Sequence, residues 1–161
     1  MFVLDSHCDT PSQIHRLRDL SLDNEFAHVD FPKLKKGGVD GAFFALYIPA
    51  DLDVAAAREY MMCLLEDVRR TVSDNADKAT LTISHSQALQ NKTDGRFSVF
   101  LGLENGSPLG EGDEAFEMLR SLYVKGVRYI TLCHSRDNQI CDSCASKSPK
   151  WGGLSPLGKR L

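Results

Sequence analysis

The chain has 161 residues, of which 42% are hydrophobic and 25% are charged. This is the composition of an ordinary globular domain that can bury a core, and it excludes the disordered and fibrous classes. The formal net charge of -3 provides no basic surface for nucleic acid or anionic lipid, so a small molecule or a peptide is the expected partner.

The first residues contain neither a basic n-region nor a long apolar run. The sequence therefore indicates no signal peptide and no membrane span, and we expect a cytoplasmic chain. The five cysteines are spread through the sequence, unlike the disulfide framework of a small secreted domain, so we expect reduced thiols.

Apolar runs alternate with amphipathic stretches along the chain. Strands are predicted at 2–4, 39–48, 80–83, 97–103 and 127–132, and helices at 53–75, from 86 onward and at 113–124. The helix from 53 has apolar residues at a spacing of three and four, with Asp53 as its expected N-cap. Strands that alternate with helices indicate parallel pairing, so we predict an α/β fold with a single domain over 1–161.

The end of the chain has the features of a helix start. Ser155 is a good N-cap residue, and Pro156 occupies the favoured first helical position. The sequence stops after about one turn, whereas about 12 residues are needed for even a marginal isolated helix. We therefore expect the chain to be a truncated form of a longer fold.

Candidate metal ligands follow the first predicted strand, in the segment Asp5-Ser6-His7-Cys8-Asp9. In extended backbone, His7 and Asp9 point the same way and can chelate one ion. An imidazole with a carboxylate suits zinc or a similar divalent metal. Polar residues that merely close a strand are the alternative, but active sites of parallel β/α folds gather at the carboxyl ends of strands.

Two further candidates follow later strands. Glu104 comes directly after the fourth predicted strand and His134 after the fifth, so both are expected at the same end of the sheet as His7 and Asp9. The alternatives are a capping or loop carboxylate for Glu104 and a structural loop histidine for His134. In the functional interpretation, His134 binds a substrate carbonyl or stabilises developing negative charge. The other histidines are expected to be structural or exposed: His15, His28 and His85.

Cys141 and Cys144 form a Cys-x-x-Cys pair. A four-cysteine zinc site needs a second pair, and Cys133 lies too near the preceding strand to be an obvious partner. The pair also does not open a helix after the first strand, as a thioredoxin-like site does. A thiol or metal role for this pair is therefore the less favoured interpretation.

Five segments occur in a characteristic order: Asp5–Pro11, Asp30–Gly38, Gly102–Gly106, Tyr129–Ser135 and Gly153–Gly158. They resemble, in the same order, the Asp-x-His-x-Asp-x-Pro, Asp-Leu-Pro-Arg-Leu-x-x-Gly, Gly-x-Glu-Gly-Gly, Tyr-x-Thr-Leu-Thr-His and Gly-Leu-Ser-x-Phe-Gly motifs of the membrane (renal) dipeptidase family, peptidase family M19. The order of the five matches makes this resemblance specific.

The resemblance implies the N-terminal half of a distorted (β/α)8 TIM-like barrel of the metal-dependent hydrolase type, cut after about four β/α units. It also implies that His7 and Asp9 bind one zinc ion, that Glu104 bridges two zinc ions, and that the catalytic residue His134 contacts the substrate. The implied reaction is hydrolysis of a dipeptide by a metal-activated water. The family's later zinc histidines, substrate-binding arginine and late acidic residue have no counterpart here, so the chain alone is expected to be inactive.

The sequence departs from the family pattern at three places. Asn105 replaces a glycine, Cys133 replaces a threonine, and 140–142 replaces Trp-Ala-Asp. We expect these differences to alter loops and to leave the ligand Glu104 intact.

Two alternatives to a dipeptidase are open. One is a related metal-dependent amidohydrolase that acts on another amide, such as a D-amino-acid dipeptide or a lactam. The other is a non-catalytic metal or thiol-binding fragment that depends on Cys141 and Cys144. In either case an open half-barrel exposes strand edges, so self-association into a homo-oligomer or aggregate is expected.

Overall fold

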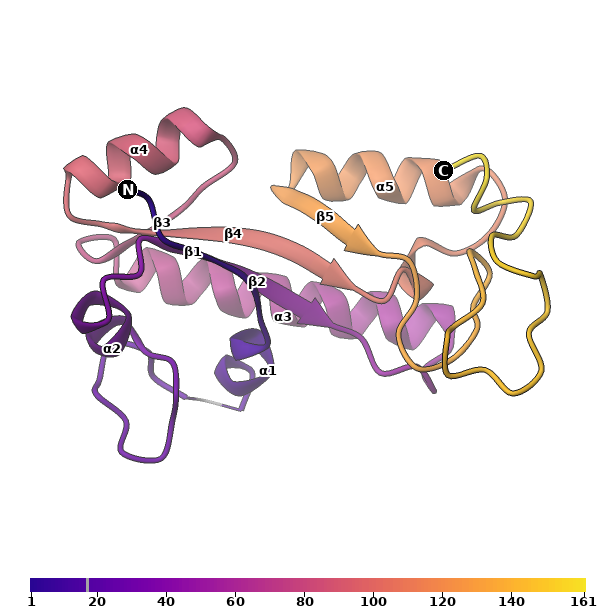
Figure 1. The fold of residues 1–161 in the computed structure, drawn as a ribbon, viewed down its shortest axis with the longest axis horizontal. Helices are drawn as coiled ribbons and strands as arrows, with labels where there is room; N and C mark the ends of the chain where they lie inside the picture. Colours follow the sequence, from indigo (N-terminus) through magenta and orange to yellow (C-terminus); the bar gives the residue numbers. More distant parts are fainter. Residues whose placement is uncertain (17) are drawn as a thin grey trace.

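A parallel sheet organises the fold (Figure 1). The structure is a computed structural model that describes residues 1–16 and 18–161, and these residues form five paired strands. The strands are β1 (Leu4–Cys8), β2 (Gly41–Tyr47), β3 (Ala79–Leu81), β4 (Phe97–Glu104) and β5 (Val127–Thr131). β1 pairs with β2 and β2 with β4, while the other edge of β4 carries β3 along its first residues and β5 along its last. Because all these pairings are parallel, the carboxyl ends of the strands lie toward one end of the sheet.

The helices are α1 (Thr10–Ile14), α2 (Phe31–Lys36), α3 (Val54–Asp74), α4 (His85–Thr93) and α5 (Glu114–Val124), with a 3-10 turn, η1, at Ser107–Leu109. The three predicted helices correspond to α3, α4 and α5. The short helices α1 and α2 were not predicted, because five or six residues are too few to show a helical repeat. No helix in the described part of the chain is both long enough and apolar enough to cross a bilayer.

Helix α3 packs its apolar stripe against the sheet. Its N-cap is the predicted Asp53, whose Oδ1 accepts a hydrogen bond from the Ala56 N–H at 2.9 Å. The buried side chains of α3 share one core cluster with the side chains of β2 and β4 that face this helix. The buried α3 residues are Ala57, Met61, Leu64, Leu65, Val68 and Val72. Each buried leucine or methionine contributes about 2 kcal/mol relative to an exposed one, so this stripe holds the sheet in place.

The two faces of β2 and β4 carry different side chains. On the face toward α3, Phe44 and Leu46 are opposite Leu101 and Leu103 in the parallel register, and all four are buried. On the other face, aromatic rings from three strands meet. Phe43 of β2 lies with its ring centroid 5.0 Å from that of Phe100 and 5.0 Å from that of Tyr129.

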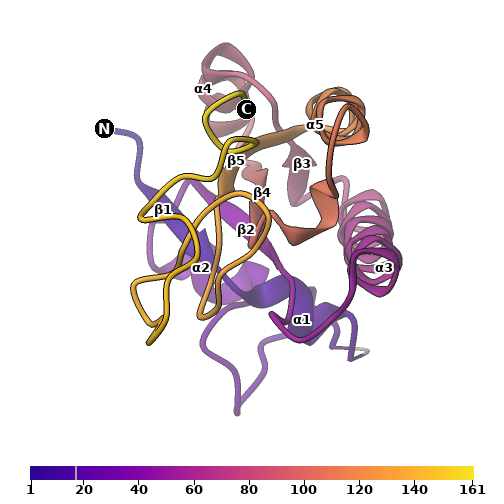
Figure 2. The ribbon, with the colours of Figure 1, turned by 90° about the vertical axis from the view of Figure 1, so that its right-hand side faces the viewer.

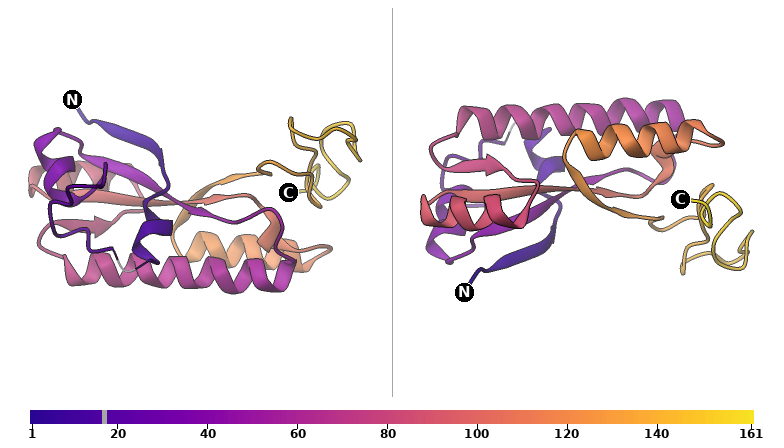
Figure 3. Two further views of the ribbon diagram at one scale, coloured as in Figure 1. Left: turned by 90° about the horizontal axis from the view of Figure 1, so that it is seen from below. Right: turned by 90° about the horizontal axis from the view of Figure 1, so that it is seen from above.

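The helices and the C-terminal segment occupy different parts of the molecule. α3 and α5 lie side by side along one side of the sheet, as Figures 2 and 3 both show. The segment after β5 lies beyond the carboxyl ends of the strands (Figure 3). The helix start expected near its end forms a capped turn, in which the Ser155 Oγ accepts from the Gly158 N–H at 2.9 Å and the Lys159 N–H donates to the Ser155 carbonyl at 3.0 Å.

Candidate metal centre

The three predicted ligands, His7, Asp9 and Glu104, meet at the carboxyl ends of β1 and β4. The Nε2 atom of His7 lies 3.1 Å from Oε2 of Glu104 and 3.4 Å from Oδ1 of Asp9. One potential ligand atom from each residue lies within 4.8 Å of the others. His7 and Glu104 are 97 residues apart in the sequence, and the ends of their two strands bring them together, as predicted.

Asp9 reaches the cluster by a different route from the expected one. The strand β1 ends at Cys8, and Asp9 occupies the N-cap position of α1 with φ −80° and ψ 15°. The strict alternation of a strand therefore does not orient this carboxylate. The chain turns because Thr10 and Pro11 begin a helix immediately after the strand, and this turn brings Asp9 next to His7.

The electrostatics of the cluster suit a cation. The Glu104 side chain is only 14% exposed. Burial raises its pKa, the nearby Asp9 carboxylate raises it further, and His7 acts in the opposite direction. A divalent ion would relieve both the desolvation and the repulsion between the carboxylates. One imidazole nitrogen with two carboxylates is a donor set that zinc accepts, so these residues fit the metal that the family resemblance implies.

His134 lies beside this cluster. It follows β5, and its Nε2 atom is 3.5 Å from Oε1 of Glu104, the oxygen that does not face His7. The Tyr47 ring contacts the His134 ring edge-on, with centroids 5.1 Å apart. The His134 side chain is 39% exposed, so it can contact a bound small molecule at the open end of the sheet.

Tyr129 is a site residue that sequence reasoning missed. It lies in β5, and its hydroxyl forms a hydrogen bond with Nδ1 of His7 at 2.7 Å. Burial, followed by the Glu104 and Asp9 carboxylates, raises the pKa of Tyr129 to about 12, so the hydroxyl keeps its proton at neutral pH. Tyr129 belongs to the Tyr-x-Thr-Leu-Thr-His segment that also contains His134, but 122 residues separate it from His7, so no local pattern indicates that the two side chains meet.

Asn105 explains how the loop after β4 accommodates a residue where the family has glycine. Its φ is 78°, a left-handed conformation that asparagine tolerates better than most residues. Its side chain donates to the Ile48 carbonyl at 3.0 Å and accepts from Asn138 at 3.1 Å. Its backbone N–H donates to the Thr131 hydroxyl at 2.8 Å. Asn105 therefore ties together the ends of β2, β4 and β5 and leaves Glu104 in the cluster, as expected.

The segment after His134 folds around Asp142. The Asp142 carboxylate accepts backbone hydrogen bonds from Lys150, Trp151 and Gly153 at 2.8 to 3.1 Å. Burial opposes ionisation of this carboxyl, but these bonds outweigh it and lower its pKa. The Ser143 hydroxyl donates to the His134 carbonyl at 2.6 Å. The loop formed by residues 142–153, called here the Asp142 loop, is therefore bonded to the backbone of His134.

The cysteine pair does not form a comparable ligand group within the described residues. Cys141 is buried and Cys144 is exposed, and both are free thiols. Burial raises the pKa of Cys141 to about 12, so its thiol stays protonated. Of the other histidines, His28 and His85 are exposed, and His15 binds Asp67 through Nδ1 at 2.7 Å.

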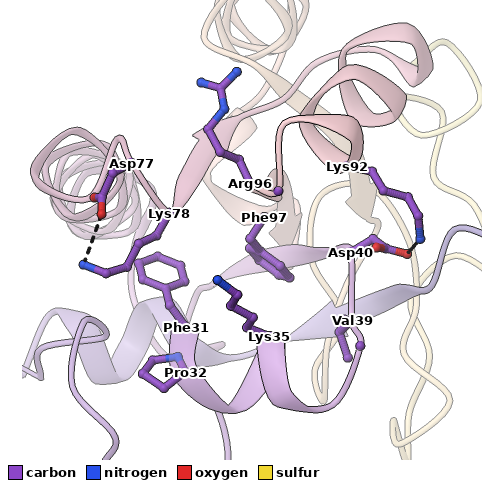
Figure 4. Close-up of a pocket in the computed structure, with 12 residues that line it drawn as sticks. Phe31, Pro32, Lys35, Val39, Asp40, Asp77, Lys78, Lys92, Arg96 and Phe97 are labelled. Atoms are coloured by element: carbon purple, nitrogen blue, oxygen red, sulfur yellow. Dashed lines mark hydrogen bonds and ion pairs between the residues drawn. The ribbon is translucent and has the colours of Figure 1, made fainter.

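A cavity of about 560 Å³ lies at the opposite end of the sheet (Figure 4). It is lined by Phe31 and Phe97 and by several cations, among them Lys92, which is paired with Asp40 at 2.7 Å. None of the candidate ligands lines this cavity. The polar cluster and the cavity are therefore separate features at the two ends of the strands.

Solved structures of dipeptidases share this fold. The chain superimposes on dipeptidase AC, a metallopeptidase of family M19, with a TM-score of 0.83 and 19% identity, covering 99% of this chain and 52% of that one. A metallopeptidase from Rhodobacter sphaeroides, solved with a phosphinate mimic of the dipeptide L-Ala-D-Ala, gives a TM-score of 0.82 at 18% identity, covering 99% and 54%. The fold is therefore a partial TIM-like barrel that covers about half of these structures, as predicted.

Similar curated sequences are fungal dipeptidases. Dipeptidase verJ of Clonostachys rogersoniana is 30% identical over 172 residues, covering 97% of this chain and 44% of that protein. Dipeptidase ataJ of Aspergillus terreus is 28% identical over 159 residues, covering 90% and 38%. The chain thus spans less than half the length of these relatives. The sequence profile of the membrane dipeptidase family, peptidase family M19, matches residues 1–161, and the chain belongs to this family.

Proposed function

We propose that His7, Asp9 and Glu104 are metal ligands of a zinc-dependent dipeptidase and that His134 is its substrate-contacting catalytic residue. The observation that carries this proposal is the convergence of the three ligand atoms within 4.8 Å at the carboxyl ends of parallel strands. Membership of a metallopeptidase family supports it independently.

The orientation of Glu104 supports a site for two ions. Its Oε2 atom faces His7 and its Oε1 atom faces His134, so the two carboxylate oxygens point to different neighbours. We propose that His7, Asp9 and Glu104 would hold one ion, and that Glu104 would also contribute to a second ion whose remaining ligands would come from polypeptide outside these 161 residues.

In this proposal the ions and the side chains have different roles. When bound, zinc polarises a peptide carbonyl and lowers the pKa of a water molecule. His134 lies 3.5 Å from Glu104 with its ring half exposed, where it can donate a hydrogen bond to the oxygen of a bound amide. Its ring contact with Tyr47 and the Asp142 loop behind it fix its position.

A dipeptide is the substrate class we propose. The names of the relatives and the dipeptide mimic in the Rhodobacter sphaeroides structure support this choice. Because the chain covers less than half of the curated relatives, we propose that the 161 residues alone bind zinc weakly and hydrolyse no dipeptide. Rapid hydrolysis of Gly-Leu by the zinc-loaded chain would contradict this statement.

Zinc titration by calorimetry tests the centre directly. His7→Ala and Glu104→Gln should each weaken zinc binding at least about ten-fold, because each removes a ligand. His28→Ala is the matched control, because it removes an exposed histidine elsewhere, and it should leave the affinity unchanged. Equal affinities in all four proteins would contradict the assignment.

A double variant separates this proposal from the thiol-binding alternative. Replacing both Cys141 and Cys144 by serine should leave zinc affinity at the wild-type value, because neither thiol belongs to the ligand cluster. If the double variant loses zinc while His7→Ala retains it, the thiol alternative is correct. A panel of dipeptides, D-amino-acid dipeptides and lactams, tested on a protein that contains the complete barrel, separates the dipeptidase from the amidohydrolase alternative.

A further inference from the structure

Both ring nitrogens of His7 have specific partners. Nε2 faces the Glu104 and Asp9 carboxylates, and Nδ1 lies 2.7 Å from the Tyr129 hydroxyl. The His7 and Tyr129 rings are stacked, with centroids 6.0 Å apart and planes 20° apart. The orientation of the imidazole is therefore set from two sides, and only one side consists of candidate ligands.

The Tyr129 ring lies directly over the backbone of Gly102. The two residues are register partners in β4 and β5. A Cβ atom built on Gly102 would lie 2.2 Å from Cζ of Tyr129 and within 2.7 Å of both Cε atoms, which is closer than any real contact. The Phe43 ring, 5.0 Å away, contacts Tyr129 as well. Gly102 therefore provides the space in which the tyrosine ring sits.

We propose that Tyr129 is a positioning residue that holds His7 with Nε2 directed at the cation, and that Gly102 is required to seat its ring. This inference rests on the proposed metal centre. It concerns how a ligand is oriented and adds no ligand to the set.

A tyrosine suits this position because its hydroxyl both donates and accepts hydrogen bonds. When the Nε2 lone pair is directed at an ion, Nδ1 carries the proton and donates to the tyrosine oxygen. Without an ion, the hydroxyl can instead donate to Nδ1. A neutral partner also fixes the ring without adding a third negative charge beside the Asp9 and Glu104 carboxylates, which both face Nε2 of His7.

The main test is zinc titration of the full chain carrying Tyr129→Phe. This change removes one hydroxyl and keeps the ring, so zinc affinity should fall about ten-fold or more. Tyr60→Phe is the matched control. The Tyr60 ring also contacts a histidine ring, that of His15, with the two centroids 5.4 Å apart. The Nδ1 atom of His15, however, is bonded to Asp67 and not to the tyrosine. The control should bind zinc as the wild type does.

The outcomes separate the two proposals. If His7→Ala loses zinc and Tyr129→Phe does not, the positioning role is wrong and the metal centre stands. If His7→Ala binds zinc as the wild type does, the metal centre itself is wrong. In that case the hydrogen bond can still be tested in the metal-free chain by nitrogen-15 NMR of the His7 ring. Tyr129→Phe should shift the Nδ1 resonance, and an unchanged resonance would overturn the inference.

Gly102→Ala tests the seating of the ring. The added methyl group should displace Tyr129 and weaken zinc binding about as much as Tyr129→Phe does, and combining the two changes should give less than the sum of their separate effects. If Gly102→Ala does not fold, the double variant Gly102→Ala with Tyr129→Ala should restore folding, because it removes the clashing ring. Wild-type affinity in Gly102→Ala, or no rescue by the double variant, would overturn this part of the inference.

Discussion

Asp30 and Glu104 are both shielded from solvent, yet their surroundings shift the pKa of the two carboxyl groups in opposite directions. Asp30 is fully buried at the start of α2, and burial alone would raise its pKa, but hydrogen bonds from Lys33 and Asn24 outweigh burial and lower it. Glu104 is less buried, but its neighbours include the Asp9 carboxylate, and its pKa is raised. Asp30 has charged and backbone donors that stabilise its ionised form, whereas Glu104 faces two histidine rings and a second carboxylate, an environment that suits a cation.

The two faces of the sheet also differ in polarity and burial. The face toward α3 is closed by apolar side chains such as Phe44 and Leu103, both 0% exposed. The opposite face ends in Tyr47, Glu104 and Tyr129, which are half-buried and polar at their tips. We expect changes on the closed face to lower stability, and changes at the open end to alter metal affinity with little cost in stability.

The largest expected effect is on the closed face. Phe44→Ala should cost about 3–5 kcal/mol of unfolding free energy, because it leaves a cavity between the sheet and α3. Urea denaturation measures this loss. Phe26→Ala is the matched control, because the Phe26 side chain is fully exposed, and it should change stability by less than about 0.5 kcal/mol. A loss below about 1 kcal/mol for Phe44→Ala would show that this face is not the core.

Asp30→Ala should cost about 3 kcal/mol, because it removes an N-cap and leaves Lys33 without its buried partner. The pKa of Asp30 is lowered in the folded protein, so its contribution is complete above the unfolded pKa and is lost as the pH falls through the folded value. The stability difference between wild type and variant should therefore shrink on acidification. Asp23→Ala, which removes the exposed partner of Lys33, is the control and should cost little. A difference that does not vary with pH would contradict the assignment.

Asn105→Ala should have an intermediate effect, about 2 kcal/mol. Alanine at φ 78° is strained, and the bonds to Ile48 and Asn138 are lost. Asn105→Gly removes the strain and loses only the bonds, so it should cost less than the alanine variant. Thermal melts of the two variants measure the difference. If glycine proves the more harmful substitution, the left-handed backbone is not what constrains this position.

The smallest expected effect on stability is at the open end. The pKa of Glu104 is raised in the folded protein, so the contribution of this one group to metal-free stability is complete below its unfolded pKa and is lost as the pH rises through the folded value. Glu104→Gln removes this loss and should raise the metal-free Tm at neutral pH by about 2 °C, while zinc binding weakens. A Tm that falls at neutral pH would indicate that Glu104 is a structural carboxylate like Asp30.

Much of the fold was predictable because its elements have clear local patterns. The apolar stripe and the Asp53 cap of α3, and the continuous apolar runs of β2 and β4, depend only on neighbouring residues. The short helices α1 and α2 were missed because they have no room for a repeat, although Pro11, Asp30 and Pro32 stabilise their starts. The shared edge of β4, which pairs with both β3 and β5, was not predictable either, because lateral strand order depends on packing.

Local sequence patterns were enough to show which residue types stand at the strand ends, and therefore to place His7, Asp9 and Glu104 at one end of the sheet. Three features depend on long-range packing: Asp9 reaches the cluster through a helix start, Glu104 faces His7 and His134 with different oxygens, and the Tyr129 hydroxyl forms a hydrogen bond with His7. The physical reason is the register between β4 and β5, which places the Tyr129 ring over Gly102. That register arises from the packing of side chains far apart in the chain, whereas local patterns report only on neighbours.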